Sequence, residues 1–275
     1  MQIPENFSWQ GHRGARGLLP ENTIPAFKKA MDLGMNTLEL DIAVSADKQI
    51  IVTHEPWMSA EICLDKDGKE MTEAQGKDLH LYKMTAAEIA LYDCGSKNHP
   101  RFPEQKKMKA VKPSLKDMVT AVEAYAKEKN YPLPFYNIEV KSQEDYDTVL
   151  SPPIAEFVRL TITEITDLGI KERTNLQSFD LRALEEMHKQ DSTIDVAYLV
   201  EFELDAPAAL KNLSFKPEIY SPYYKLVNED MMRKMKKRDI KVIPWTVNET
   251  EEMKELIALG VDGIITDYPN RVPKK

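Results

Sequence analysis

Short extended segments alternate with amphipathic helical segments along most of this 275-residue chain. The expected strands cover residues 7–10, 37–44, 49–54, 135–140, 174–179, 195–200, 218–221, 241–247 and 262–266, and the expected helices cover residues 20–34, 115–129, 154–168, 181–189, 228–238 and 249–259. This alternation is typical of an α/β fold with a parallel sheet, and about eight such units favour a closed (β/α)8 barrel, the TIM barrel. A doubly wound open sheet is the alternative.

Two segments break the alternation and make the predicted barrel slightly irregular. The stretch between Asp41 and Gln49 is too short for a crossover helix, which predicts an extended return or an irregular pairing. Residues 55–113 are rich in charge, proline and glycine, and they are too long for an ordinary loop. We expect a single domain over residues 1–275, in which residues 55–113 form a small subdomain inserted after the third strand. Because this insertion begins directly after His54, we expect it to cap the C-terminal face of the barrel.

The composition narrows the kinds of partner that such a barrel could bind. A net charge of −8 argues against a nucleic-acid-binding face and against a basic patch for membranes. No apolar run approaches the roughly 18 residues of a membrane span, and the first residues lack the pattern of a signal peptide. We therefore expect a soluble protein with a small-molecule partner, no nucleic acid and no stable membrane insertion. Its compartment (cytoplasmic, or exported or periplasmic with the signal removed) and its oligomeric state stay open.

Cysteine and histidine are both rare in this chain. Cys63 and Cys94 fit neither a disulfide framework nor a metal-binding motif, so we expect two ordinary thiols. Three of the five histidines lie in the insertion or on a helix face, where we expect exposure to solvent: His80, His99 and His188. His12 and His54 instead follow predicted strands. Because histidine titrates near neutral pH, this pair is suited to donating and accepting protons in one reaction cycle.

Polar side chains gather at the C-terminal ends of the predicted strands, which form the active-site face of a TIM barrel. They are His12, Arg13, Glu39, Asp41, His54, Glu139, Lys141, Gln177, Ser178, Tyr220 and Trp245. Glu39 and Asp41 are two residues apart and therefore point to the same face of a strand. Together with Glu139 they place three carboxylates in otherwise apolar strands, a donor set that suits Mg²⁺ or Ca²⁺. The alternative is a buried network of ion pairs with Arg13 or Lys141.

Short motifs that follow one another over residues 9–269 resemble those of the glycerophosphodiester phosphodiesterases. The motifs are HRG at residues 12–14, PENT at 20–23, ELD at 39–41, His54, EVK at 139–141, QSFD at 177–180, WTVN at 245–248 and DGIITDYP at 262–269. The resemblance implies a TIM barrel with a small insertion after the third strand. It also implies hydrolysis of glycerophosphodiesters to glycerol 3-phosphate and an alcohol. Glu55 is a departure, because the family usually has aspartate after the second histidine.

The resemblance further implies a role for each candidate site residue. The implied roles are general base for His12, general acid for His54, ligands of Mg²⁺ or Ca²⁺ for Glu39, Asp41 and Glu139, and diester contacts for Arg13 and Lys141. We expect Gln177 and Trp245 to complete the substrate site, with Trp245 as an apolar wall for the glycerol carbons. The nucleophile is either water or the substrate's own 2-hydroxyl group.

The glycine-rich sequence GHRGARG at residues 11–17 is interpreted in the same way. Gly11 and Gly14 allow the backbone to turn sharply or to approach a ligand closely. The loop is expected to direct His12 and Arg13 into the barrel mouth, where the planar guanidinium of Arg13 suits phosphate oxygens. The patterns of nucleotide-binding glycine loops are absent from the sequence.

Three other functions stay open at this point. A phospholipase-type phosphodiesterase acting on lipid or lysolipid diesters would use similar histidines, but it would favour an exposed apolar rim. A sugar isomerase or decarboxylase barrel would also use acids at strand ends and a metal, without explaining the HRG motif. A non-catalytic binding module would tolerate the loss of one histidine, whereas both are present here.

Overall fold

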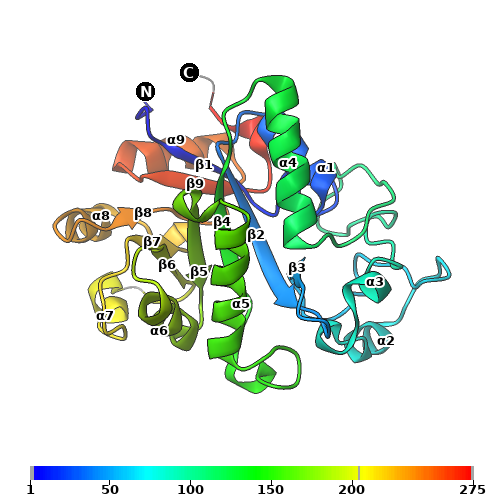
Figure 1. Cartoon of the computed structure of the whole chain (residues 1–275). Coiled ribbons are helices and arrows are strands. Elements are labelled where there is room, and N and C mark those ends of the chain that lie inside the picture. Colours follow the sequence, from blue (N-terminus) through cyan, green and yellow to red (C-terminus); the bar gives the residue numbers. More distant parts are fainter. Residues whose placement is uncertain (1–2, 204, 274–275) are drawn as a thin grey trace.

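Eight parallel strands form a barrel with helices around it in the computed structural model, which describes residues 3–203 and 205–273 (Figure 1). The strands are β1 (Ser8–Gly11), β2 (Thr37–Val44), β4 (Phe135–Val140), β5 (Thr174–Ser178), β6 (Asp195–Val200), β7 (Ile219–Pro222), β8 (Lys241–Val242) and β9 (Gly263–Thr266). Their order is β8-β7-β6-β5-β4-β2-β1-β9. The segment after β8 closes the barrel, because Ile265 N–H donates to Pro244 O (3.0 Å) and Val247 N–H donates to Ile265 O (2.9 Å). The predicted TIM barrel is confirmed.

Helices alternate with these strands in the positions that the sequence indicates. They are α1 (Ile24–Asp32), α4 (Leu115–Lys129), α5 (Ile154–Asp167), α6 (Leu181–Gln190), α7 (Ala206–Leu210), α8 (Glu229–Lys236) and α9 (Thr250–Leu259). Short α7 has no counterpart among the predicted helices. Strand β8 is shorter than the predicted strand over residues 241–247, because Pro244 has no N–H group to donate to a neighbouring strand.

The alternation of side chains along β2 separates the core from the barrel interior. Leu38, Leu40 and Ile42 are fully buried in the main apolar core, which contains residues of both strands and helices. Glu39 and Asp41 lie on the opposite face of the strand and therefore point into the barrel. A separate small apolar layer is formed by Ala197, Ile219, Ile243 and Ile265. The acidic side chains thus belong to the inner face of the barrel.

The stretch between Asp41 and Gln49 is an extended return, one of the two predicted possibilities. Strand β3 (Ile50–Val52) pairs antiparallel with the last residues of β2. This hairpin brings the chain back to the barrel mouth, where Thr53 N–H donates to Asp41 O (2.9 Å). His54 therefore lies beside Asp41, although no crossover helix connects the two segments.

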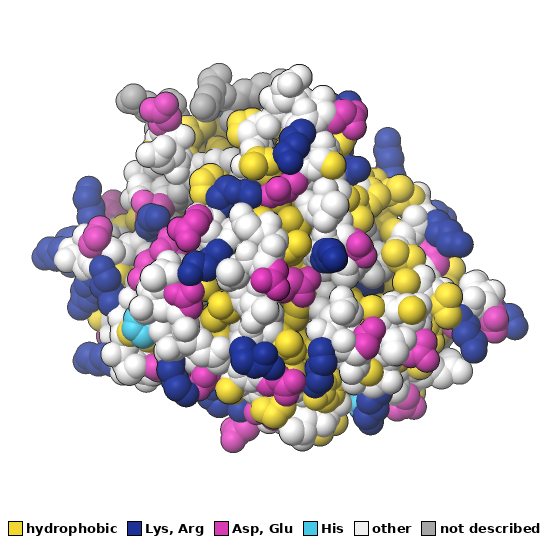
Figure 2. Space-filling model, viewed as in Figure 1, with side chains coloured by type: hydrophobic (Ala, Val, Ile, Leu, Met, Phe, Trp, Pro, Cys, Tyr) yellow, Lys and Arg dark blue, Asp and Glu magenta, His cyan; other side chains and the backbone are white. Residues whose placement is uncertain are grey.

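The surface of the molecule carries charges of both signs. Figure 2 shows acidic and basic side chains interspersed over one face, with hydrophobic side chains in groups between them. Over residues 3–203 and 205–273, no helix combines the length and the apolar character that crossing a membrane requires.

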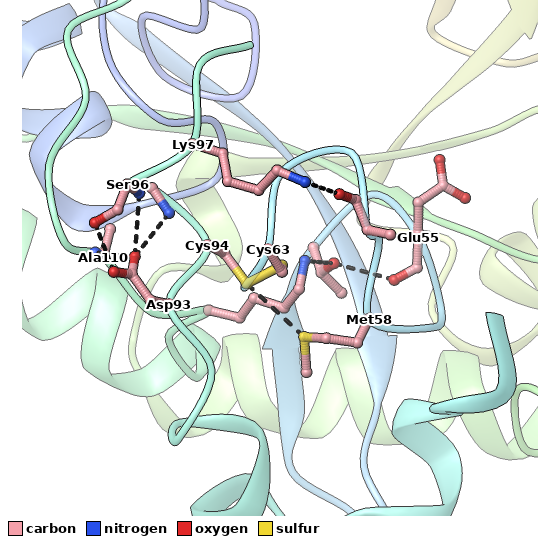
Figure 3. Close-up of a disulfide and its surroundings, with 12 residues drawn as sticks. Glu55, Met58, Cys63, Asp93, Cys94, Ser96, Lys97 and Ala110 are labelled. Carbon is pink, nitrogen blue, oxygen red and sulfur yellow. Dashed lines mark hydrogen bonds between the residues drawn. A yellow bond between two sulfur atoms is a disulfide. The ribbon is translucent and has the colours of Figure 1, made fainter. Parts of the chain in front are cut away.

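Residues 55–113 follow β3 and contain two short helices, α2 (Glu73–Asp78) and α3 (Ala86–Ile89), which lie beside β3 in Figure 1. The insertion and the adjoining hairpin share an apolar cluster of Ala43, Ile51, Met58, Cys63, Leu81, Ile89, Tyr92 and Cys94. Within it, Cys63 and Cys94 form a disulfide (Figure 3). The expectation of two ordinary thiols is wrong, because packing in one cluster joins two cysteines whose spacing follows no known framework.

Candidate active site

A cavity of about 410 Å³ lies at the C-terminal ends of the barrel strands. Eight of the nine candidate site residues line it: His12, Arg13, Glu39, His54, Glu139, Lys141, Gln177 and Trp245. The ninth, Asp41, has its carboxylate within 4.8 Å of the carboxylates of Glu39 and Glu139. The structure therefore brings all nine side chains together at one end of the barrel.

Glu39, Asp41 and Glu139 form a compact, buried acidic cluster on the neighbouring strands β2 and β4, where Asp41 and Glu139 are paired in register. Burial and the nearby Asp41 carboxylate raise the pKa of Glu39 well above its usual value. Burial also raises the pKa of Glu139 to about 7. For Asp41 burial acts in the same direction, but the positive charges of Arg13, His54 and Lys141 and a hydrogen bond from Asn22 together outweigh it and lower the pKa. The cluster is therefore a place of strong mutual repulsion.

This cluster fits a divalent cation. Oδ1 of Asp41 is buried and has no hydrogen-bond partner within the described part of the chain. The other carboxylate oxygen of Asp41 accepts a hydrogen bond from Asn22 Nδ2 (2.9 Å), which fixes the orientation of the group. Hard cations such as Mg²⁺ and Ca²⁺ prefer oxygen ligands of this kind, and their charge would offset the repulsion.

The glycine-rich loop after β1 positions Arg13. Arg13 and Gly14 have left-handed φ angles of 50° and 86°. A Cβ atom on Gly14 would lie 2.6 Å from the carbonyl carbon of Ala26, so this position requires glycine. Arg13 Nη1 donates to Glu21 Oε1 (2.8 Å), and its Nε lies 3.2 Å from Asp41 Oδ2. The guanidinium is thus held between the PENT motif and the acidic cluster.

Two residues of the PENT motif support the site, a role that the sequence analysis did not predict. Glu21 also accepts a hydrogen bond from Arg16 Nε (2.6 Å), and Asn22 donates to Asp41 as described. Burial opposes ionisation of Glu21, but the guanidinium groups of Arg13 and Arg16, with smaller contributions from His99 and His54, together lower its pKa. The sequence analysis placed this polar pair inside a helix over residues 20–34, whereas α1 begins at Ile24 after its N-cap Thr23 and leaves the pair free to support the site.

His12 follows β1 and is held by Asp267, at the end of β9. Burial tends to raise the pKa of Asp267, but the interaction with His12 keeps this pKa low. The ionised carboxylate accepts a hydrogen bond from His12 Nδ1–H (2.6 Å). The other ring nitrogen, Nε2, lies 4.0 Å from Glu39 Oε2. Burial lowers the pKa of His12. A neutral imidazole therefore offers its Nε2 lone pair to the acidic cluster and the cavity.

His54 has a carboxylate partner of its own. Its Nδ1–H donates to Glu55 Oε1 (2.6 Å), and its Nε2 accepts a hydrogen bond from Lys141 Nζ (3.1 Å). Lys141 also donates to Glu139 Oε1 (2.8 Å) and so connects the second histidine with the acidic cluster. Burial and the positive charge of Arg13 lower the pKa of His54.

Some strand-end residues have contacts that the sequence analysis did not anticipate. Gln177 lines the cavity, but its Nε2 donates to Glu39 Oε1 (2.9 Å) and so orients a candidate metal ligand. Ser178 Oγ donates to Val140 O (2.9 Å), and Tyr220 belongs to the main apolar core. The expectation that Ser178 and Tyr220 face the site is wrong.

Trp245 belongs to an apolar wall of the cavity that also contains Phe179, Leu199 and Ile265. Its Nε1–H donates to Ser221 O (2.9 Å), which fixes the indole, and its ring meets the Phe179 ring edge-on at 5.4 Å. The wall offers carbon-rich surface beside the charged groups of the cavity.

The insertion contributes Arg101 and Phe102 to the cavity lining. It docks through His99, which is 6 % exposed. Its Nε2 lies 3.6 Å from Glu21 Oε2, and its ring meets Phe102 edge-on at 4.7 Å. The expectation of an exposed His99 is wrong, because this side chain packs between the insertion and the PENT motif. His80 and His188 are half-buried.

Known proteins are similar to this chain over nearly its whole length. The model of the glycerophosphoryl diester phosphodiesterase family matches residues 12–271 of this chain. A glycerophosphodiester phosphodiesterase from Caldanaerobacter subterraneus is 30 % identical over 94 % of this chain and 93 % of its own length. A rat (Rattus norvegicus) lysophospholipase D is 26 % identical over 95 % of this chain and 83 % of its own length.

Solved structures are also similar to this chain. The crystal structure of a protein from Silicibacter pomeroyi, named as a candidate glycerophosphoryl diester phosphodiesterase, superposes on this chain with a TM-score of 0.84. The two chains are 28 % identical, and the match covers 96 % of this chain and 91 % of the other. A phosphodiesterase from Oleispira antarctica, determined with the product sn-glycerol-3-phosphate, has the same fold at a TM-score of 0.75 and 19 % identity, covering 98 % and 95 %. The chain therefore belongs to the glycerophosphoryl diester phosphodiesterase family, whose members are phosphoric diester hydrolases.

Proposed function

We propose that this protein hydrolyses glycerophosphodiesters to glycerol 3-phosphate and an alcohol, with Mg²⁺ or Ca²⁺ as its cofactor. The observation that carries the proposal is the meeting of three buried carboxylates, two histidines and two cationic side chains at one cavity. A phosphodiester is an anion, and this chain has a net charge of −8. A substrate of this kind therefore needs a local positive site, which a metal ion and basic side chains would supply.

Glu39, Asp41 and Glu139 would hold the cation, because they are the three carboxylates that converge within 4.8 Å. A bound divalent cation supplies Lewis-acid stabilisation of the charge that develops on the phosphate. Arg13 and Lys141 flank the acidic cluster, and each would bind a non-bridging phosphate oxygen. Their pairing with carboxylates in the free protein keeps both groups charged and directed into the site.

We assign general-base catalysis to His12 and general-acid catalysis to His54. His12 Nε2 would accept the proton of the attacking hydroxyl as the new P–O bond forms. His54 would donate a proton to the departing alcohol oxygen as the old P–O bond breaks. Arg13 and Lys141 are among the groups that lower the pKa of His54. A phosphate anion bound to both would offset this effect and favour the protonated histidine that the second step needs.

The insertion would cap the site and contact the alcohol part of the substrate. Arg101 and Phe102 carry this proposal, because both line the cavity and both belong to the insertion. The apolar wall around Trp245 would then contact the glycerol carbons. The barrel would then bind the glycerol part of the substrate, and the insertion would bind the alcohol part.

Lysolipid diesters are a second candidate substrate class. Two side chains on the loops after β5 and β6, Phe179 and Phe202, are 40 % and 82 % exposed, which gives the barrel mouth an apolar margin. Phe179 also belongs to the wall around Trp245, so the margin continues into the cavity. An acyl chain attached to the glycerol would find carbon surface there.

Product analysis tests these proposals directly. The protein is incubated with glycerophosphocholine or lysophosphatidylcholine, with and without Mg²⁺ or Ca²⁺, and the phosphorus products are followed by ³¹P NMR. Glycerol 3-phosphate from the first substrate supports the main proposal, whereas its absence under every metal condition contradicts it. If only lysophosphatidylcholine is cleaved, with lysophosphatidic acid as the phosphorus product, the second candidate is favoured. A transient cyclic phosphate identifies the 2-hydroxyl group as the nucleophile in place of water.

The Cys63–Cys94 disulfide supports an oxidising compartment for the protein. Disulfides persist mainly in extracellular or periplasmic surroundings, because cytosolic thiols are kept reduced. Thiol counting on protein taken directly from its native compartment is the test. Two reactive thiols in the unfolded, unreduced chain would contradict this assignment.

A further inference from the structure

Asn248 and Asp267 lie on the Nδ1 side of His12, and no step of the proposed reaction uses them. Both come from motifs that the sequence analysis singled out, WTVN and DGIITDYP. Asp267 is nearly buried, with 4 % of its surface exposed. Burying an ionised carboxylate costs free energy unless its oxygens accept hydrogen bonds. The hydrogen bonds of Asp267 should therefore explain why it lies buried beside His12.

The hydrogen bonds around Asp267 have a fixed direction. The main-chain N–H of Asp267 donates to Asn248 Oδ1 (2.9 Å), and a main-chain N–H cannot act in any other way. The amide group of Asn248 must therefore present its Nδ2 to Asp267 Oδ2, where it donates at 2.9 Å. Asp267 Oδ1 remains free to accept the bond from His12 Nδ1–H (2.6 Å).

Thr266 strengthens this direction. Its hydroxyl oxygen accepts the main-chain N–H of Tyr268 (3.1 Å), so its own proton is available to donate to Asn248 Oδ1 (3.3 Å). Two donors thus hold the oxygen end of the Asn248 amide. The orientation of Asn248 is therefore set by the main-chain N–H of Asp267 and the hydroxyl group of Thr266, at the end of β9, and not by His12.

We propose that Asn248 and Asp267 are positioning residues that hold His12 in the tautomer protonated at Nδ1, so that Nε2 is the proton acceptor. The inference rests on the proposed role of His12 as general base. It assigns no contact with substrate to either residue. The backbone fixes Asn248, Asn248 fixes Asp267, and Asp267 fixes the ring, so the lone pair faces the cavity before substrate binds.

The substitution Asp267→Asn tests the direction of the bonds. Asn248 still donates, so the new amide must use its oxygen to accept from Asn248 and present its NH₂ group to His12 Nδ1. The ring would then carry its proton on Nε2 and lose its base. We expect kcat for glycerophosphocholine to fall by about 10²- to 10⁴-fold, the range for loss of general-base catalysis, while KM changes less than about threefold.

The double variant Asp267→Asn with Asn248→Asp reverses one bond and restores the ring. The carboxylate introduced at position 248 can still accept the main-chain N–H, and its second oxygen accepts from the new amide. The amide oxygen then faces His12 Nδ1–H again, so at least a roughly tenfold recovery of kcat over the single variant is expected, a part of the general-base contribution. A purely structural role for Asp267 predicts no recovery, because the double variant carries two substitutions instead of one.

Asp262→Asn is the matched control. Asp262 stands directly before β9, and it accepts a hydrogen bond from Val242 N–H (2.8 Å) through a carboxylate oxygen that an amide oxygen can replace. This variant should keep activity within about twofold of the wild type. Loss of activity in Asp262→Asn equal to that in Asp267→Asn would overturn the inference, because the effect would then follow from any such change near β9.

Nitrogen-15 NMR of the imidazole rings gives a readout that does not depend on activity. The neutral ring of His12 should show the Nδ1-protonated pattern in the wild type and the Nε2-protonated pattern in Asp267→Asn. An Nε2-protonated His12 in the wild type would overturn the proposal even if no variant folds, and so would an unchanged kcat in Asp267→Asn. If the wild-type protein hydrolyses no glycerophosphodiester, the proposed function fails separately, while the tautomer prediction is still decided by NMR.

Discussion

The two histidine–carboxylate pairs differ in their surroundings, although both have a 2.6 Å bond from Nδ1. In the first pair the side chains of His12 and Asp267 are 13 % and 5 % exposed. In the second pair those of His54 and Glu55 are 27 % and 32 % exposed. Asp267 is held by a further donor from Asn248, whereas Glu55 is simply the next residue along the chain. The first pair joins residues from opposite ends of the chain and is held by the barrel, whereas the second pair joins two neighbouring residues.

This difference suits the two proposed roles. A general base needs its lone pair in place before the substrate arrives, which a buried and oriented ring provides. A general acid must exchange one partner for another, because His54 Nε2 is engaged by Lys141 in the free protein. A partly exposed ring on a short segment can make that exchange. The comparison therefore predicts unequal responses when each pair is altered.

Removing either imidazole should have the largest effect, and the leaving group should separate the two roles. His54→Ala is expected to lose about 10² to 10⁴ in rate on glycerophosphocholine, because the alkoxide leaves poorly without a proton. The same variant should be largely rescued on a nitrophenyl diester, since nitrophenolate leaves well unaided. His12→Ala should be slow on both substrates, because the nucleophile still has to lose its proton.

Steady-state rates on the two substrates, for both variants and the wild type, check this assignment. The reverse pattern would exchange the roles of the two histidines. Equal losses of rate on both substrates in both variants would contradict the assignment of different catalytic roles to the two histidines. Thermal unfolding of each variant serves as the control for folding.

Metal removal should have the next largest effect and should not distinguish the two pairs. Treatment with a chelator is expected to lower hydrolysis by about 10³-fold, since a bound cation contributes several kcal/mol of charge stabilisation. Added Mg²⁺ or Ca²⁺ should restore it. Glu39→Gln should resemble the stripped protein, because a neutral amide is a poor substitute for a carboxylate ligand. Full activity in metal-free protein, verified by elemental analysis, would rule out this mechanism.

A smaller effect is expected at the local pair. Glu55→Gln keeps an oxygen that can accept from His54 Nδ1–H, and among the described residues no side chain donates to Glu55 as Asn248 donates to Asp267. We expect a loss of about tenfold or less on glycerophosphocholine, from the weaker bond of a neutral acceptor. The matched measurement is Asp267→Asn under the same conditions. A loss at Glu55 as large as that at Asp267 would remove the contrast between the pairs.

The same contrast explains what the sequence could and could not predict. Strands β2 and β4 have the predicted bounds, and most of each strand, residues 37–42 and 136–140, alternates apolar with polar residues. Most of the nine candidate residues lie near or just after strand ends, whereas Glu39 and Asp41 lie within β2 on its inner face, and barrel geometry brings both groups to one mouth. The partner of His54 is its neighbour, whereas Asp267 is 255 residues from His12 and is joined to it by barrel closure. No local pattern contains that pairing.

The insertion after the third strand was predicted, but the contacts within it were not, for a related reason. Its apolar cluster is small and its helices are short, so periodicity gives little signal there. Its disulfide and the burial of His99 depend on which segments pack together. Composition indicates that such a segment has structure of its own, but it does not specify contacts. The barrel and the position of the insertion are therefore predictable from local pattern, and the contacts inside the insertion are not.

The smallest expected effect concerns the alcohol part of the substrate and the insertion. Arg101 is exposed and lies at the cavity, so Arg101→Ala should disturb folding little while changing contacts with the head group. We expect changes of a few-fold in the relative kcat/KM values for glycerophosphocholine, glycerophosphoethanolamine and glycerophosphoglycerol, because a surface charge contributes about 1 kcal/mol or less. Arg233→Ala, on α8, is the matched control. If the three ratios stay constant while all rates fall together, the insertion stabilises the barrel mouth and does not select the substrate.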